Sequence, residues 1–253
     1  MRATKPILGL AAAILLATAA PAGASLLPVG DWTFNEGRGS VARDYSGHHE
    51  EGQLEGAAQW TRGRFQDGLS FDGSTAAVRV ADNPALEPAQ VTVSAWVKAA
   101  ASPGIYRYVL AKGANGCAAA SYGLYTGPDG GIAFYTSRED GFAWTISPEA
   151  TASTVWNGQW HNVIGTYDGS IVRLYLDGRE IGSGTPDSAP IAYNLQTSDE
   201  LSIGAYPWCP SSDFAGEIDE VKVFDRALGA QEIGLGYGIS RLLPSVIPFD
   251  VIL

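Results

Sequence analysis

The sequence predicts an all-β protein, built as a sandwich of two antiparallel sheets with one short C-terminal helix. Three observations lead to this prediction: glycine is frequent, with 31 of 253 residues, charged side chains make up only 17% of the chain, and short β-rich runs recur between turn dipeptides. Such runs are typical of strands joined by tight turns, and they do not fit a helical or βαβ protein.

The N-terminus has the features of a secretory leader. Arg2 and Lys5 precede an apolar run over residues 7–20, and Ala22 and Ala24 form an A-x-A cleavage signal before Ser25. The run is too short and too rich in alanine for a membrane span, which needs on the order of 20 residues. We therefore expect residues 1–24 to be a signal peptide, the mature protein to be secreted to the extracellular space, and no membrane insertion.

The charge balance narrows the possible partners. Without residues 1–24, which hold two basic and no acidic side chains, 14 Lys and Arg face 27 Asp and Glu, a formal charge of −13. A chain this acidic is repelled by nucleic acid and by anionic membrane surfaces. We expect neither as a partner.

Twelve runs are predicted strands, and they follow one another along the whole mature chain. In order they are residues 31–34, 68–71, 77–80, 91–97, 107–112, 121–126, 131–137, 142–147, 159–168, 171–178, 200–206 and 217–224. In 91–97 and 171–176 apolar residues alternate with others, the period of a strand. The turns "YDGS" and "LDGRE" make the runs at 159–168 and 171–178 consecutive hairpin strands.

A helix is predicted after the last strand. Gly229 is the cap, Leu228 and Ile233 take the staple positions, and Glu232 takes the third helical position, with the end near Gly236. The predicted domain runs from 26 to 236. Residues 237–253 form an apolar tail, which Pro244 and Pro248 keep from being a regular element.

The two cysteines, Cys117 and Cys209, both lie among turn residues. In an exported chain we expect them to form a disulfide. The alternatives are two free thiols and a zinc site, and the three histidines lie elsewhere in the sequence.

Five motifs in order resemble the LamG-like (laminin G-like) jelly rolls of the concanavalin A-like lectin and glucanase superfamily. They are "WTFNEGRGSVARDYSGHHEEGQL", "GLSFDGS", "VTVSAWVK", "WHNVIGTYDGSIVRLYLDG" and "FAGEIDEVKVFDRALGAQEI". The resemblance implies a concanavalin A-like jelly-roll sandwich with six or seven strands in each sheet, and binding sites on the concave face or at the loops of one edge. It also implies a bridge from the loop after "VLAKG" to the loop before the last strand. The fold hosts lectins, adhesion modules and hydrolases alike, so it does not fix the function.

The motif "EIDE" raises the question of catalysis. Retaining glucanases of the superfamily carry Glu-x-Asp-x-Glu on one strand, because alternate residues there flank one glycosidic bond. Here Glu217 and Asp219 share a face, Val221 stands where the second Glu should be, and Glu220 is expected on the opposite face. We therefore predict no catalytic residues.

The last strand resembles instead the closing strand of those glucanases, whose Asp binds a structural calcium. By that resemblance Asp219 is a calcium ligand, with Asp44 as its expected partner, since a closed sandwich often brings the first and last strands together. The alternative is that Asp44 caps a turn and that Asp219 accepts local hydrogen bonds.

Aromatic side chains are the best candidates for a ligand platform, because a flat ring stacks on the apolar face of a sugar. Most of the seven tryptophans fall at strand motifs, where they are expected in the core. The candidate ligand-binding residues are Trp208, Trp144, Tyr206 and Tyr106, and Tyr108 and Tyr125 are expected to border the same edge. His161, within a predicted strand, is expected to be packed and hydrogen-bonded.

The sequence thus predicts a secreted, non-catalytic binding module that recognises carbohydrate or another extracellular surface. The alternatives are a glycoside hydrolase or lyase on the same scaffold, and an adhesion module that binds a protein.

Overall fold

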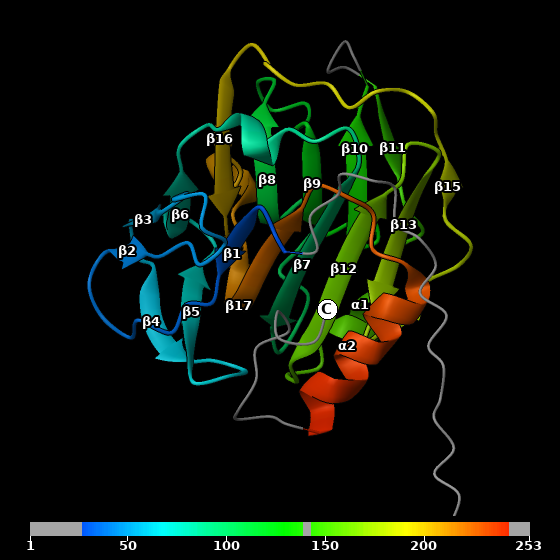
Figure 1. Ribbon diagram of the computed structural model, residues 1–253. Helices are drawn as coiled ribbons and strands as arrows, with labels where there is room; N and C mark the ends of the chain where they lie inside the picture. Colours follow the sequence, from blue (N-terminus) through cyan, green and yellow to red (C-terminus); the bar gives the residue numbers. More distant parts are fainter. Residues whose placement is uncertain (1–26, 139–142, 243–253) are drawn as a thin grey trace, which may run out of the picture.

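The computed structural model describes residues 27–138 and 143–242, which form a sandwich of two antiparallel sheets (Figure 1). The predicted signal peptide at 1–24 and residues 243–253 of the predicted tail lie outside this range. Among the described residues, no helix has the length and apolarity to span a membrane.

Sheet A carries the C-terminal helix on its outer face (Figure 1). Within the described residues it has nine strands. In spatial order they are β14 (Arg179–Glu180), β13 (Ile171–Leu176), β12 (His161–Tyr167), β7 (Val91–Lys98), β17 (Ala215–Phe224), β5 (Asp67–Asp72) and β4 (Gln59–Arg62), while β1 (Gly30–Trp32) pairs with β17 and β15 (Thr185–Pro186) with β13.

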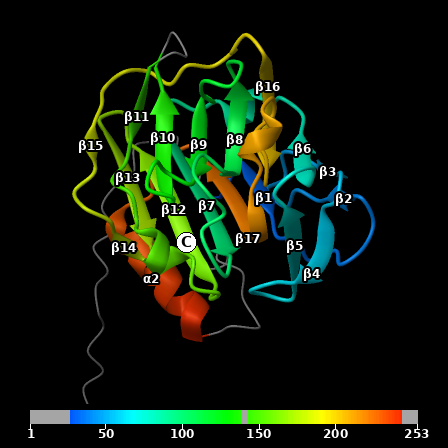
Figure 2. The same cartoon turned by 180° about the vertical axis from the view of Figure 1, so that it is seen from behind.

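Sheet B lies on the other side of the sandwich, and Figure 2 shows it towards the viewer. Its eight strands in the described residues are β11 (Trp144–Ile146), β10 (Ala133–Ser137), β9 (Tyr122–Tyr125), β8 (Tyr108–Ala114), β16 (Ser198–Ile203), β6 (Ala77–Val80), β3 (Gly52–Glu55) and β2 (Val41–Ala42). Three short helical turns connect strands: η1 (Pro84–Leu86), α1 (Ala152–Val155) and η2 (Pro210–Ser212).

The main core lies between the sheets and follows the predicted alternation. In β7 the valines and Ala95 point into this core, while Trp96 on the opposite face stacks on Tyr237 of the helix α2 (Ala230–Leu242). A smaller cluster under α2 contains Ile233 and Phe224. Both faces of sheet A are therefore buried where α2 covers it.

Two expectations about the elements need correction. The sheets have more strands than the six or seven expected, because short strands such as β2 and β14, with two residues each, add to their edges. The helix begins as predicted, and Glu232 accepts a hydrogen bond from Gly229 N–H at 3.2 Å, but it continues to Leu242. Residues 237–242, expected in the tail, are helical.

Candidate binding pocket

A pocket lined by tyrosines lies on the outer face of sheet B, over β8, β9 and β10. It has a volume of about 380 Å³, and its described lining residues are Tyr106, Tyr108, Cys117, Ala118, Tyr125, Pro128, Tyr135, Trp144, Ile146, Tyr206, Cys209, Ser211 and Ser212. This volume lies within the usual range for sites of small ligands, about 300 to 1,000 Å³.

The strand register explains why tyrosines gather here. Tyr135 lies opposite Gly123 in the next strand, and Gly123 lies opposite Ala111. In the neighbouring row Tyr125 lies between Tyr108 and Ala133. Large rings thus lie beside small residues, which gives the outer face of the sheet an uneven aromatic surface instead of a flat one.

The rings contact one another and are held by hydrogen bonds. Tyr108 and Tyr206 have ring centroids 4.7 Å apart, and those of Tyr125 and Tyr135 are 4.9 Å apart. The hydroxyls of Tyr108 and Tyr135 lie 2.9 Å apart, and Ala120 N–H donates to the Tyr135 oxygen at 2.7 Å. Because the tyrosine pair uses only one of its two phenolic protons for this bond, the other proton is available to a ligand acceptor.

These phenols stay neutral at physiological pH. Burial raises the pKa of Tyr108, Tyr125 and Tyr135 above the ordinary tyrosine value, and burial raises the pKa of Tyr206 to about 12. The Tyr206 hydroxyl makes no hydrogen bond of normal geometry in the described residues, although the Asn115 backbone lies near enough to lower its pKa slightly. The pocket therefore offers neutral hydroxyl groups as donors.

Gly123 leaves the space that the rings occupy. A Cβ atom added there would lie 2.7 Å from Tyr135 Cε1 and 3.0 Å from Tyr108 Cε1. We expect Gly123→Ala to lower the free energy of unfolding by about 1 to 3 kcal/mol through overpacking, measured by urea denaturation. Gly238→Ala is the matched control, since its new Cβ meets nothing within 4 Å, and we expect it to stabilise α2 by about 0.5 to 1 kcal/mol. Equal stabilisation by both variants would contradict this account of the pocket floor.

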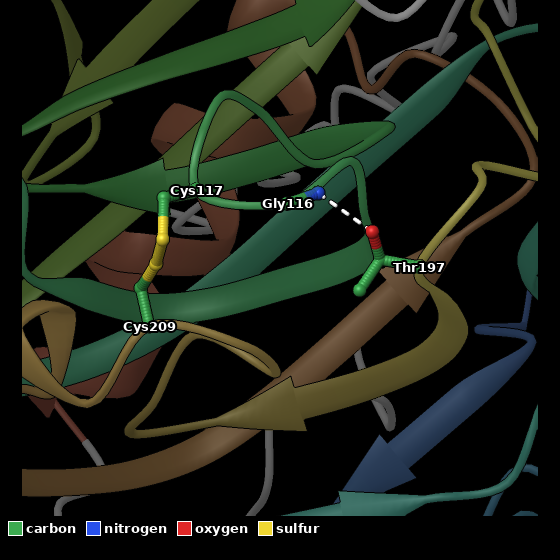
Figure 3. Close-up of a disulfide and its surroundings, with 4 residues drawn as sticks. All are labelled: Gly116, Cys117, Thr197 and Cys209. Atoms are coloured by element: carbon green, nitrogen blue, oxygen red, sulfur yellow. Dashed lines mark hydrogen bonds between the residues drawn. A yellow bond between two sulfur atoms is a disulfide. The ribbon is translucent and has the colours of Figure 1, made fainter.

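The predicted disulfide is confirmed and forms part of the pocket wall. Cys117 and Cys209 are bridged, with Cα atoms 5.6 Å apart, and they join the loop after β8 to the loop after β16. Figure 3 shows the bridge beside the hydrogen bond that Gly116 N–H donates to Thr197 Oγ1 at 2.7 Å. The alternatives of free thiols or zinc ligation are thereby excluded for both cysteines.

Three of the four predicted aromatic residues are among the described lining residues of this pocket. Tyr106, Trp144 and Tyr206 line it. Trp208 is not among the lining residues, but it stands between Tyr206 and Cys209, and its side chain is 60% exposed. Trp144 and Tyr106 are 44% and 48% exposed, so three of the four predicted side chains present an open aromatic surface.

Sequence reasoning missed Tyr135 and the two serines of η2, Ser211 and Ser212. The alternation in 131–137 carried a signal for Tyr135, because it points away from the neighbouring Phe134, which lies in the core between the sheets. The serines follow Cys209 and Pro210 in the chain, and the bridge at Cys209 ties their loop to the loop of Cys117.

The "EIDE" residues lie on the other sheet, and the expected direction of Glu220 is wrong. The pairing of β17 with β7 shifts register between Asp219 and Lys222, and Glu220 has a left-handed backbone with φ of 50°. This bulge turns Val221 into the core and places Glu220 Oε2 3.6 Å from Lys222 Nζ, on the outer face of sheet A.

These carboxylates are engaged in ion pairs and hydrogen bonds. Glu217 Oε2 lies 2.9 Å from Lys98 Nζ, and Asp219 accepts from Phe65 N–H at 3.0 Å and Glu220 N–H at 2.9 Å. Glu220 and Asp219 are buried. They do not line the tyrosine pocket.

Asp44 accepts hydrogen bonds from its own turn and from Asp31. Its Oδ1 accepts from the backbone N–H groups of Asp31 and Ser46, and its Oδ2 accepts from Ser46 Oγ–H and Glu50 N–H. Burial raises the pKa of Asp44, but these hydrogen bonds outweigh it and lower the pKa overall. This is the turn-capping alternative.

Within 27–138 and 143–242 no three His, Cys, Asp or Glu side chains are placed to hold a metal ion, so calcium stays a prediction without a ligand set.

His161 is packed and hydrogen-bonded, as expected. Its Nδ1 lies 2.8 Å from Asp177 Oδ2, and its Nε2 lies 3.1 Å from Asn157 Oδ1.

Comparisons with known proteins agree with this architecture. The model of the laminin G-type family of concanavalin A-like lectins and glucanases matches residues 72–234, more than half of the chain. A search of curated proteins gives no match.

Solved structures share the fold at low sequence identity. Domain 4 of AbnA, a GH43 extracellular arabinanase from Geobacillus stearothermophilus solved with arabinotriose, superposes with a TM-score of 0.62 at 18% identity, over 82% of this chain and 97% of that domain. The botulinum neurotoxin serotype D ligand-binding domain with N-acetylneuraminic acid gives 0.63 at 14% identity, over 85% of this chain and 51% of the other.

A third structure, the binding domain of botulinum neurotoxin DC with rat synaptotagmin II, gives a TM-score of 0.62 at 13% identity, over 84% of this chain and 52% of the other. The chain thus spans about half the length of these toxin domains. Together with the two sheets and the matched residues, the comparisons establish that the chain belongs to the concanavalin A-like lectin/glucanase superfamily.

Proposed function

We propose that this chain is an exported, non-catalytic module that binds carbohydrate in the tyrosine pocket. The observation that carries the proposal is the pocket itself: five tyrosines and a tryptophan surround a hollow of about 380 Å³, with serine hydroxyls at one side. Ligand sites commonly combine apolar and aromatic walls with a few polar groups of this kind.

The chemistry of a sugar matches these groups. Aromatic faces such as Trp144 and Tyr106 can stack on the C–H face of a sugar ring, which removes apolar surface from water. The remaining phenolic proton of the Tyr108–Tyr135 pair and the hydroxyls of Ser211 and Ser212 can bond the oxygens of the ring.

Two features support a binding role over catalysis. Glycoside hydrolysis needs a pair of carboxyl groups at the scissile bond, and the described lining of the pocket includes neither Asp nor Glu. The acidic residues of β17 lie on sheet A, where lysines and backbone N–H groups engage them. Sustained release of reducing sugar from a polysaccharide would favour a glycoside hydrolase or lyase over a binding module.

Export is supported by the disulfide, because such bridges persist in oxidising compartments. The structural neighbours also support a sugar ligand, since one was solved with arabinotriose and another with N-acetylneuraminic acid. These ligands are properties of those proteins, and the sugar bound by this chain has to be found by a glycan screen.

Trp144→Ala tests the site directly. We expect it to weaken binding of the glycan found in the screen by on the order of tenfold, since an aromatic contact contributes about 0.5 to 1.5 kcal/mol beyond the area it buries. Isothermal titration calorimetry measures the change. Tyr45→Ala is the control, because this side chain is 55% exposed and does not line the pocket. Equal loss in both variants would contradict the assignment of the pocket.

Trp208→Ala reports how far the site extends. Because Trp208 stands outside the described pocket lining, we expect its loss to weaken binding of long oligosaccharides and to leave that of a monosaccharide unchanged.

A protein-binding adhesion module is the second candidate. Exposed apolar surface marks many protein interfaces, and it favours this candidate here. The exposed side chains are those of Ile105, Tyr106, Trp144 and Trp208. A glycan screen without any hit, together with capture of a defined extracellular protein that Trp144→Ala abolishes, would favour this candidate.

A further inference from the structure

The described lining of the tyrosine pocket is uncharged. Its thirteen described lining residues are aromatic, apolar or hydroxyl-bearing, together with the two bridged cysteines, and none of them is Arg, Lys, Asp or Glu. Burial raises the pKa of Tyr108, Tyr125, Tyr135 and Tyr206, so these phenols also carry no charge. An anionic ligand would enter this pocket without a cation to pair with.

Two charged residues, Glu149 and Arg107, adjoin residues of the lining. Burial raises the pKa of Tyr125 most, and Tyr106 and the Glu149 carboxylate raise it further. Arg107 lies between Tyr106 and Tyr108 in the chain but does not line the pocket. The whole chain carries a formal charge of −11. The net charge of the chain therefore does not attract anions.

Desolvation is the physical basis of selection. Moving a carboxylate from water into a site of low dielectric constant costs free energy. A bidentate arginine or another cation normally compensates this cost. The neutral phenol and serine hydroxyls form weaker hydrogen bonds than charged donors do. An uncharged sugar has no such cost and uses the same donors.

We propose that this pocket selects uncharged saccharides and discriminates against sugars that carry a carboxylate, such as sialic acids and uronic acids. The proposal rests on the carbohydrate-binding function proposed above and adds the class of ligand.

Pairs of glycans with a free or a methyl-esterified carboxyl group test this selection. Polygalacturonate is compared with its fully methyl-esterified form, and 3′-sialyllactose with its methyl ester, by calorimetry or surface plasmon resonance on the full chain. We expect the uncharged member of at least one pair to bind at least tenfold more tightly. We also expect this binding to be insensitive to NaCl between 50 and 500 mM, because no ion pair contributes to it.

A gain-of-function variant makes the test two-sided. Ala118 lines the pocket and is exposed, so Ala118→Arg places a cation at the wall without filling the core. We expect the variant to bind the anionic member at least tenfold more tightly than the wild-type chain does, in a salt-dependent manner, with an unchanged melting temperature.

The outcomes separate this inference from the proposed function. Preference of the wild-type chain for an anionic member would overturn the inference while carbohydrate binding stands. Absence of binding to every glycan, charged and uncharged, would overturn both.

Discussion

Replacing both Cys117 and Cys209 by serine is expected to lower the free energy of unfolding by about 4 to 5 kcal/mol. The bridge closes a loop with a sequence separation of 92 residues, and a crosslink over such a loop restricts the unfolded chain strongly in the entropic account. An ordinary domain has a free energy of unfolding of about 5 to 15 kcal/mol in total, so this loss is a large part of it. Urea denaturation of the double variant measures it.

The same change is expected to weaken ligand binding. Both cysteines line the pocket, and the bridge holds the loop with Ala118 beside the one with Ser211 and Ser212. Dithiothreitol serves as the control: it should destabilise the wild-type chain as much as the serine substitutions do, and it should leave the double variant unchanged. A double variant as stable as the wild-type chain would show that the bridge contributes nothing to the free energy of unfolding.

The alternation of side chains made the long strands predictable. All twelve predicted runs overlap a strand of the structure, since runs such as 91–97 place valines on one face and polar or aromatic residues on the other. The short strands β2, β14 and β15 were not predictable, because two residues carry no period. They exist because longer neighbours provide hydrogen-bonding edges.

The end of α2 and the bulge in β17 are tertiary effects. Gly236 suggested a helix end, but Trp96 stacks on Tyr237 and favours continuation of the helix. At Glu220 a non-glycine residue takes a left-handed conformation. No local sequence signal marks it, and the neighbouring Lys222, 2.9 Å from Asp31, forms a buried ion pair that only the folded sheet creates.

The sequence indicated which aromatic residues could line the site, but it did not indicate that buried tyrosines on the outer face of sheet B form a pocket. Trp144, Tyr106 and Tyr206 could be chosen from their places beside loops and turns. The second face of sheet B could not be told from the core face, because both are apolar: in β9 every residue is buried, with Tyr122 and Leu124 in the core and Tyr125 in the outer cluster.

The free energy of unfolding is expected to fall as pH rises from 5 to 8, and Asp219 is the reason. The pKa of this carboxyl is raised from 3.8 to about 8, because burial and, second, the nearby Glu220 raise it by more than backbone N–H groups such as that of Phe65 lower it. The folded state then binds a proton that the unfolded state has already released. Stability is therefore greatest near the ordinary pKa of an aspartate and is lost progressively up to the raised value.

The expected slope is about 1.4 kcal/mol per pH unit, so the loss between pH 5 and pH 8 is roughly 4 kcal/mol. The side chain of Asp219 is completely buried, which leaves no solvent screening to reduce the effect. Below pH 4 the trend reverses, because Asp44 and Asp168 have lowered pKa values and their protonation costs stability. The chain should thus be most stable in mildly acidic solution.

Asp219→Asn should remove most of this slope, since an amide does not titrate. The variant loses hydrogen bonding to one of the two backbone N–H groups, at a cost of about 1 kcal/mol, so it should be less stable than the wild-type chain at pH 5 and more stable at pH 8. Glu217→Gln removes a carboxylate of the same strand but leaves Asp219 in place, and its slope should match that of the wild-type chain. Urea denaturation at intervals of half a pH unit gives the three curves. A slope that persists in Asp219→Asn would assign the pH dependence to another group, because no proton could then be exchanged at position 219.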